Sequence, residues 1–223
     1  MITSWSFSSL MDYEACPLRA KHKLDKAPKP PYVENRGTAL HARIEKYLFD
    51  TPDDFNDIHP KARDEIQAYK KLLLTEDFES AVEGKIGIDK NWRTVPYDQA
   101  WGKAIMDLSF CKTDDTLLTI VDWKSGKSEG NEIKHIMQGQ LYALMNADMF
   151  KHIQVEFLYL DEGKTRRNLY HKEQIQKWQP KWQTRAAKMT QAMIFPPKPS
   201  KANCRFCAYG PQGSDICTFG ITQ

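Results

Sequence analysis

The stretch Thr116-Leu-Leu-Thr-Ile-Val-Asp-Trp-Lys-Ser-Gly-Lys127 decides the fold, because it joins a strand pattern to two charged groups. β-Branched and leucine side chains dominate it and a Ser-Gly turn closes it, which predicts a β-strand. Strand alternation divides its side chains between two faces, Leu118, Ile120, Asp122 and Lys124 on one and Leu117, Thr119, Val121 and Trp123 on the other. An acid and a base therefore stand together where the strand leaves its apolar core. Alone, this pair fits either an exposed salt bridge or a metal-dependent hydrolase.

Composition indicates one domain, or one domain with a small appendage. The chain has 223 residues, of which 41% are hydrophobic and 27% charged. It lacks the roughly 18 consecutive apolar residues of a membrane span and the features of a signal peptide, so a cytoplasmic protein with no membrane partner is expected. The net charge of +3 does not require a nucleic-acid partner. Basic clusters at 19–23 and 164–167 fit either phosphate tracks or solvated edges.

Hydrophobic periodicity predicts an alternation of helices and strands. Helices are expected at about 6–16, 38–48, 60–74, 131–149 and 172–194, the last kinked or divided at Pro180. Strands are expected at about 81–88, 100–110, 116–124, 152–160 and 165–170. Prolines at 27–31 and 195–200 mark connections.

Three charged side chains converge in this arrangement. A hairpin of the strand at 100–110 and the strand from Thr116 places Asp107 and Asp122 on adjacent strands, facing one side beside Lys124. Two buried acids are costly to ionise, which favours a divalent metal between them; two exposed aspartates are the alternative. His41 lies at the core edge of its helix, where a hydrogen-bonded core histidine is the usual interpretation. Gln138 and Tyr142 share one helix face.

The ordered set Gly37-x-x-x-His41, Asp107, Asp122-x-Lys124 and Gln138-x-x-x-Tyr142 resembles the PD-(D/E)xK nuclease superfamily. Within it the set is similar to the RecB-like branch, which includes the RecB and AddB nuclease domains and the CRISPR-associated RecB-like exonucleases. The resemblance runs from Cys16 to Cys217. It implies an α/β (α+β) fold with a restriction-endonuclease-like core, in which helices flank a central mixed sheet.

The resemblance also implies roles for individual residues. The implied ligands of Mg²⁺ or Mn²⁺ are His41, Asp107, Asp122 and the backbone carbonyl of Trp123. Lys124 would orient or activate the attacking water and stabilise charge on the phosphate. Gln138 and Tyr142 would hold the DNA backbone or Lys124. Glu83 matches an acidic position that often precedes the metal aspartate, and is the weakest candidate.

The five cysteines are Cys16, Cys111, Cys204, Cys207 and Cys217. An odd number in a cytosolic chain argues against a disulfide framework. The resemblance implies that all except Cys111 bind a [4Fe–4S] cluster, which would join segments 1–31 and 196–223 beside a nuclease core at about 32–195, within one domain. The nine residues before Cys217 exceed the spacing expected of the family, and a four-cysteine zinc site is the alternative. Cys111 is expected to be a small core residue.

These observations predict a metal-dependent DNA exonuclease that hydrolyses phosphodiester bonds from single- or double-stranded DNA ends in recombination, repair or replication-linked processing. The chain has no room for a helicase module and no Walker-type loop, so it acts alone or with a helicase, recombinase or integrase. A nuclease that trims prespacers in CRISPR adaptation is one alternative. A catalytically silent scaffold that binds DNA ends is another. The sequence makes no prediction of the oligomeric state.

Overall fold

The computed structural model describes residues 2–28, 36–113 and 115–222. The chain divides into two compact units: one is Glu34–Pro180, and the other combines Met1–Val33 with Lys181–Gln223. The first unit contains the whole β-sheet and the convergent charged residues. Most of the proline loop expected at 27–31 lies outside the described residues.

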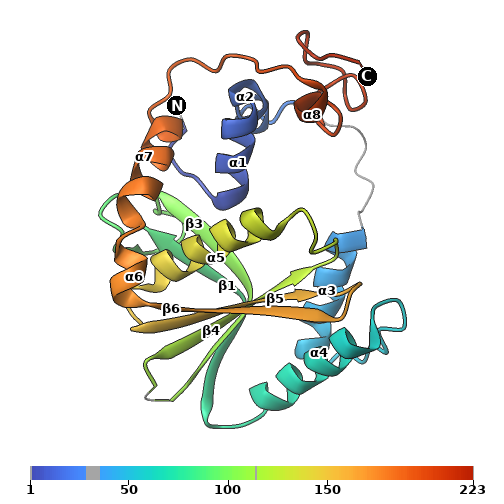
Figure 1. Cartoon of the computed structure of the whole chain (residues 1–223), viewed down its shortest axis with the longest axis vertical. Helices are drawn as coiled ribbons and strands as arrows, with labels where there is room; N and C mark the ends of the chain where they lie inside the picture. The colour runs from blue at the N-terminus through green and yellow to red at the C-terminus, as the bar shows by residue number, and fades with distance from the viewer. Residues whose placement is uncertain (1, 29–35, 114, 223) are drawn as a thin grey trace. The chain divides into compact units, whose positions relative to one another are not determined.

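A mixed six-stranded sheet forms the centre of the first unit (Figure 1), which confirms the mixed sheet that the resemblance implied and adds one strand to the five expected. Its spatial order is β2-β1-β3-β4-β5-β6, and only β4 and β5 are parallel. The strands are β1 (Phe78–Ile88), β2 (Thr94–Val95), β3 (Gly102–Lys112), β4 (Leu117–Lys124), β5 (His152–Tyr159) and β6 (Lys164–His171). The predicted strand from Thr116 is thus β4, in the middle of the sheet. Because layers cover both of its faces, Leu118 to Trp123 are buried on either side of the strand.

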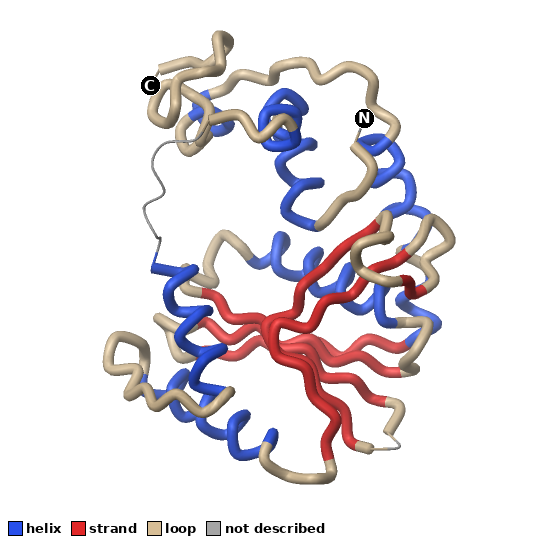
Figure 2. Tube along the Cα trace, turned by 180° about the vertical axis from the view of Figure 1, so that it is seen from behind, coloured by secondary structure: helices blue, strands red, loops and turns tan. Residues whose placement is uncertain are grey.

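Two helices, α3 (Arg36–Leu48) and α4 (Pro60–Leu73), cover one face of the sheet (Figure 2). Their apolar stripes meet strand residues in one core cluster: Leu40, Ile44, Leu48, Phe55, Ile58, Ala62, Ile66, Tyr69, Leu108, Val121, Trp123, Leu158 and Leu160. Pro60 begins α4, where a missing N–H costs nothing, and the His59 side chain accepts a hydrogen bond from the Lys61 N–H at 3.2 Å. This packing fixes α3, and with it His41, against the middle strands.

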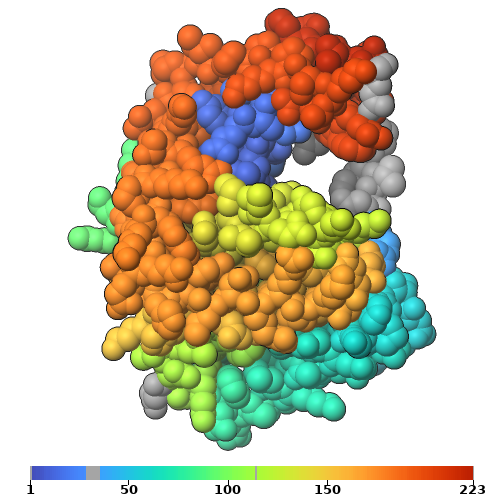
Figure 3. Space-filling model, in the orientation of Figure 1, coloured from blue at the N-terminus to red at the C-terminus, as the bar shows by residue number. Residues whose placement is uncertain are grey.

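The helix α5 (Glu132–Asn146) packs on the opposite face. Gly139 permits a close approach to β5, since a Cβ there would lie 3.3 Å from the Phe157 ring. In the space-filling view α5 and β6 form adjoining parts of one outer face of this unit (Figure 3). The α5 face that carries Gln138 and Tyr142 therefore points at the sheet rather than at open solvent.

The second unit is helical and contains α1 (Phe7–Ala15), α2 (Pro17–Leu24), α8 (Lys201–Cys204) and all but the first two residues of α7 (Gln179–Thr190). Ser6 caps α1 through a capping box. Trp182 is 1% exposed and stacks on Trp5 with ring centroids 6.5 Å apart, so it is a core residue of this unit. The Arg185 guanidinium pairs with Glu14 at 2.7 Å and links α7 to α1.

Several expectations need correction. The helix expected at 172–194, kinked or divided at Pro180, is divided near that proline into α6 (Lys172–Gln176) and α7, but α7 already ends at Thr190. Met193, within the range expected to be helical, is 80% exposed beyond the end of α7. Cys111 is partly exposed near the end of β3, so it is not a core residue. Among the described residues no helix is both long and apolar enough to cross a membrane.

Candidate active site

Three acidic side chains occupy one row across neighbouring strands. Glu83 of β1 faces Asp107 of β3 in the register set by the pairs on either side, Val82 with Leu108 and Gly84 with Met106. The same register continued from the Leu108–Val121 pair sets Asp107 opposite Asp122. The Glu83–Asp107 pair is missing from a β1–β3 ladder that continues on both sides of it, and the β3–β4 ladder ends at Leu108–Val121, so β3 and β4 separate where Asp107 and Asp122 lie.

Glu83 has a backbone conformation that directs its side chain into this row. Its φ is 50°, in the left-handed region that a residue with a Cβ rarely adopts. A cost of about 1–2 kcal/mol accompanies that conformation, and such strain concentrates at functional sites. Glu83 was the weakest sequence candidate because the register of its strand was uncertain, and a strand pattern does not signal a left-handed residue in its middle.

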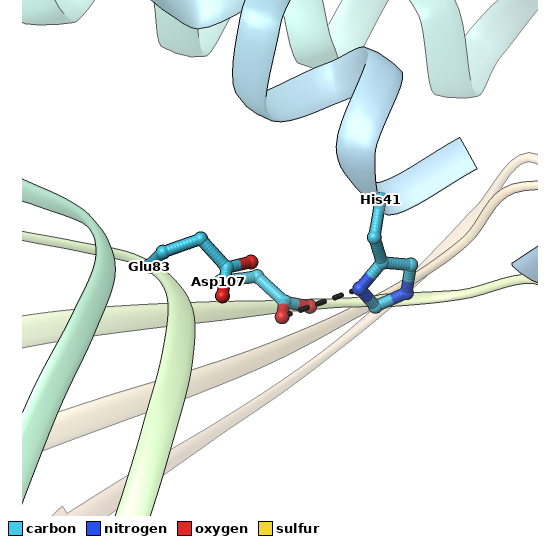
Figure 4. A group of neighbouring side chains, drawn as sticks. All are labelled: His41, Glu83 and Asp107. Atoms are coloured by element: carbon cyan, nitrogen blue, oxygen red, sulfur yellow. Dashed lines mark ion pairs between the residues drawn. The ribbon is translucent and has the colours of Figure 1, made fainter. Parts of the chain in front are cut away.

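His41, Glu83 and Asp107 form a compact group with one potential ligand atom each, all within 4.8 Å of one another. Figure 4 shows the three side chains converging, His41 from α3 and the two acids from the sheet. His41 Nδ1 lies 3.3 Å from Asp107 Oδ1. Two carboxylates and one imidazole are a donor set that suits Mg²⁺ or, better, Mn²⁺. The residues therefore fit the cation that the sequence predicted.

The titration behaviour of the group fits a cation site. Burial first, and then the charge of Asp122, raise the pKa of Asp107. Burial and the charge of Asp107 raise the pKa of Glu83. Burial alone would lower the pKa of His41, but the hydrogen bond to Asp107 and the charge of that carboxylate outweigh it and raise the pKa. Ionised together, these carboxylates repel one another, and a bound divalent cation removes that repulsion.

Asp122 belongs to a second, directly adjoining network. Asp122 is only 3% exposed, and its carboxylate lies 2.5 Å from Lys124 Nζ. It also accepts hydrogen bonds from Gln138 Nε2 and from the Tyr142 hydroxyl, both at 2.9 Å. Gln138 completes the network by accepting from Lys124 Nζ at 3.0 Å and donating to the Tyr142 hydroxyl at 2.8 Å. Asp122 is thus outside the compact group of three and is bound to the lysine instead.

A backbone contact connects the two networks. The Trp123 N–H donates to Asp107 Oδ2 at 2.7 Å, which fixes the Asp107 carboxylate between His41 and the backbone of β4. The structure thus brings together every predicted side chain of the site: His41, Glu83, Asp107, Asp122, Lys124, Gln138 and Tyr142. The ligand role of the Trp123 carbonyl stays a prediction.

An open cavity of about 430 Å³ gives access to the compact group. It is lined by Gly37, Thr38, His41, Ala42, Glu45, Glu83, Ile105 and Asp107. Glu45 is an acid that the sequence interpretation missed. Its position one helical turn after His41 was a readable signal, because residues four apart share a helix face.

A second cavity, within the helical unit, is lined by Cys16, Cys204, Cys207 and Cys217, the same four cysteines that the family pattern singled out. The Lys198 N–H lies 3.4 Å from Cys16 Sγ. Among the described residues no cysteine belongs to a group of three metal-binding side chains within 4.8 Å of one another. Within the described part of the chain, the four cysteines thus line one cavity, but no three of their sulfur atoms lie within 4.8 Å of one another.

The strands of this mixed sheet present Glu83 and Asp107 to an open cavity, and the Asp122–Lys124 pair adjoins them, an arrangement typical of a metal-dependent nuclease. The model of the PD-(D/E)XK nuclease superfamily matches residues 4–212, so the chain belongs to that superfamily. No curated protein matches the chain significantly. Among solved structures, the crystal structure of SSO0001 is similar with a TM-score of 0.46 and 13% identity, over 99% of this chain and 88% of that one. That likeness is too distant to carry an argument about function.

Proposed function

We propose that the protein is a Mg²⁺- or Mn²⁺-dependent DNA exonuclease of the RecB-like branch, which hydrolyses phosphodiester bonds from DNA ends. The observation that carries this proposal is the junction between a His41–Glu83–Asp107 group and an Asp122–Lys124 pair, joined through the Asp107–Trp123 contact. Superfamily membership supports nuclease chemistry, and the order of motifs along the chain supports the branch and the preference for ends.

In this proposal His41, Glu83 and Asp107 hold the cation. A divalent ion there lowers the pKa of a bound water and neutralises charge that develops on the scissile phosphate. Asp122, which the sequence predicted as a ligand, lies close enough to raise the pKa of Asp107 by its charge. We propose that Asp122 does not bind the cation directly but orients Lys124 and adds negative charge next to the cation.

Lys124 is the residue that we propose acts on the phosphate and the attacking water. Its side chain is 19% exposed and is held by Asp122 and Gln138, so the ammonium has a fixed position at the edge of the site. Tyr142 is 5% exposed and bonds Asp122. We therefore assign Gln138 and Tyr142 as positioning residues for Lys124 and Asp122, in preference to direct contacts with DNA.

We propose a [4Fe–4S] cluster in the cysteine cavity, with a zinc ion as the alternative. Tetrahedral zinc with Zn–S bonds of about 2.3 Å brings its sulfurs to within about 3.8 Å of one another. A four-iron cluster holds its cysteines farther apart, because each sulfur binds a different iron. No three cysteine sulfurs among the described residues lie within 4.8 Å, which favours the larger group. Bound metal would link the two chain segments of the helical unit and contribute folding free energy.

The proposal retains the expected context of recombination, repair or replication-linked processing, with prespacer trimming as the narrower alternative. A catalytically silent scaffold is disfavoured, because the acids and the lysine remain in place and in contact. The lysine in particular has no packing role that requires it: an apolar side chain would fill its place against the Phe157 ring, 5.4 Å from the ammonium.

A cleavage assay tests the proposal. Linear DNA labelled at either end, in single- and double-stranded form, and a closed circle of the same sequence are incubated with Mg²⁺ or Mn²⁺ and with excess chelator. We expect metal-dependent release of label from linear DNA only. Cutting of the closed circle would replace the exonuclease by an endonuclease, and absence of cleavage with both metals would favour the silent scaffold.

Matched variants assign any activity to the site. Asp107→Asn and Lys124→Ala should each reduce cleavage at least a hundredfold with the fold intact. Asp98→Asn, an exposed aspartate in a turn away from the acidic row, should cleave as the unmodified protein does. Equal activity in all three variants would show that the site is elsewhere.

A further inference from the structure

Besides the four cysteines, two side chains with hydrogen-bond donors, Arg19 and His22, line the cysteine cavity. The short helix α2 follows Cys16 directly, and Arg19 and His22, three residues apart on one face of it, line the same cavity as the four cysteines. Both side chains can donate hydrogen bonds. The cavity is therefore bordered by donors as well as by sulfurs.

His22 has a buried nitrogen that lacks a partner within the described part of the chain. Its Nε2 is shielded from solvent and makes no hydrogen bond to any described residue. The ring is fixed in place by Tyr209, with ring centroids 5.2 Å apart. An unpaired buried polar group costs about 1–3 kcal/mol, so such atoms generally serve a bound ion, water or cofactor. The cavity that His22 lines is the space in which that partner would lie.

The charge beside the cavity is positive. Arg19 Nε pairs with Asp12 Oδ1 at 3.3 Å, but Lys23 uses the other oxygen of the same carboxylate, also at 3.3 Å. Two cations therefore share one anion next to the cysteines. On the cysteine side, the Lys198 N–H already donates toward Cys16 Sγ. Positive charge and hydrogen-bond donors together favour a more negative occupant.

We propose that His22 donates a hydrogen bond from Nε2 to a sulfur of the bound cluster and, with the charge of Arg19, sets the equilibrium of its reduction. This inference rests on the proposed [4Fe–4S] cluster. One electron from a low-potential one-electron donor takes the cluster core from 2+ to 1+, so the unit with its four thiolates passes from 2− to 3−; no bond is made or broken and no proton is transferred. Donors to sulfur stabilise the more negative form and raise the potential. The cluster would then change its oxidation state in a controlled way as well as link the two chain segments of the helical unit.

Spectroelectrochemistry of the full chain, purified without oxygen, tests this inference. Three variants are compared with the unmodified protein: His22→Phe removes the donor and keeps the ring against Tyr209, His22→Gln keeps an Nε2 donor, and Lys21→Gln removes an exposed positive charge from the same helix. We expect His22→Phe to disfavour reduction at least threefold, a negative shift of about 28 mV at 59 mV per tenfold. His22→Gln and Lys21→Gln should stay close to the unmodified protein.

Iron content and visible absorption, measured on each sample, separate the outcomes. An unchanged potential in His22→Phe with full iron content would overturn the role of His22 and leave the cluster standing. An equal shift in Lys21→Gln would show a general charge effect and would also overturn it. A protein that contains zinc or no metal would overturn the cluster and the inference together. None of these three results bears on DNA cleavage by the acidic row.

Discussion

Replacing Gln138 by leucine tests whether the position of Lys124 matters to catalysis. Gln138 contacts both charged members of the pair: it accepts from Lys124 Nζ at 3.0 Å and donates to Asp122 Oδ2 at 2.9 Å. Leucine has a similar volume and makes neither bond. The direct Lys124–Asp122 pair at 2.5 Å and the Tyr142–Asp122 bond both survive the change. The ammonium therefore stays in the site but loses one of its two anchors.

The expected size of the effect follows from those two bonds. Hydrogen bonds to charged groups contribute about 1.5–3 kcal/mol each. Because Asp122 keeps other donors, we take only the Lys124 bond as lost to the transition state, about 2 kcal/mol, which corresponds to a roughly thirtyfold lower cleavage rate. Folding should suffer less, by about 1 kcal/mol, since no buried charge is left alone. Single-turnover cleavage of end-labelled DNA measures the rate, and urea unfolding measures the stability.

Gln140→Leu is the matched control, because it makes the same chemical change two residues later on α5, a position that does not contact the pair. It should retain the full cleavage rate. A Gln138→Leu protein that folds normally and cleaves at the unmodified rate would refute the positioning role. Loss of rate in both variants would trace the effect to the helix and not to Lys124.

Three further predictions follow from single features of the sheet unit. Gly130 and Gly163 both have a left-handed φ, 79° and 59°, but of the two only Gly163 has another group, the His59 ring, in the space that a Cβ would take. Gly163→Ala should therefore lower the free energy of unfolding by more than the about 1–2 kcal/mol expected for Gly130→Ala, and equal losses in urea melts would contradict this. Burial lowers the pKa of His135 from 6.5 to about 4, so between these pH values the unfolded chain binds more protons and the free energy of unfolding rises with pH. His135→Gln should flatten this rise between pH 4.5 and 7. An unchanged slope would show that His135 is not its source. Glu83→Gln should weaken Mn²⁺ binding at least tenfold by calorimetry, and unchanged affinity would remove Glu83 from the site.

Much of the sheet unit was readable because its residues carry strong local signals. Alternation, turn residues and apolar stripes marked five of the six strands and the three helices that cover the sheet. Pro180 signalled a break and marks one. The two-residue strand β2 is too short to carry an alternation pattern. The helix α2 was missed because it is short and rich in basic residues, and its apolar side is limited to a few residues such as Pro17, Ala20 and Leu24.

The residues that gather at the site were predictable, but their division into two networks was not. Residue types and order pointed to His41, Asp107, Asp122 and Lys124 in one place, and the structure brings them into contact. Which acid faces the histidine and which faces the lysine depends on where the ladder between strands opens. That opening, like the left-handed backbone of Glu83, is a tertiary feature with no signature in a single sequence.

Anomalous diffraction at the manganese edge, from crystals of the protein grown with Mn²⁺, tests the central claim most directly. The account predicts a manganese peak in contact with Asp107 and His41, with Glu83 beside it and Lys124 at the edge of the same site. A peak confined to other residues, or none in crystals that bind Mn²⁺ in solution, would contradict the proposed metal-dependent nuclease site.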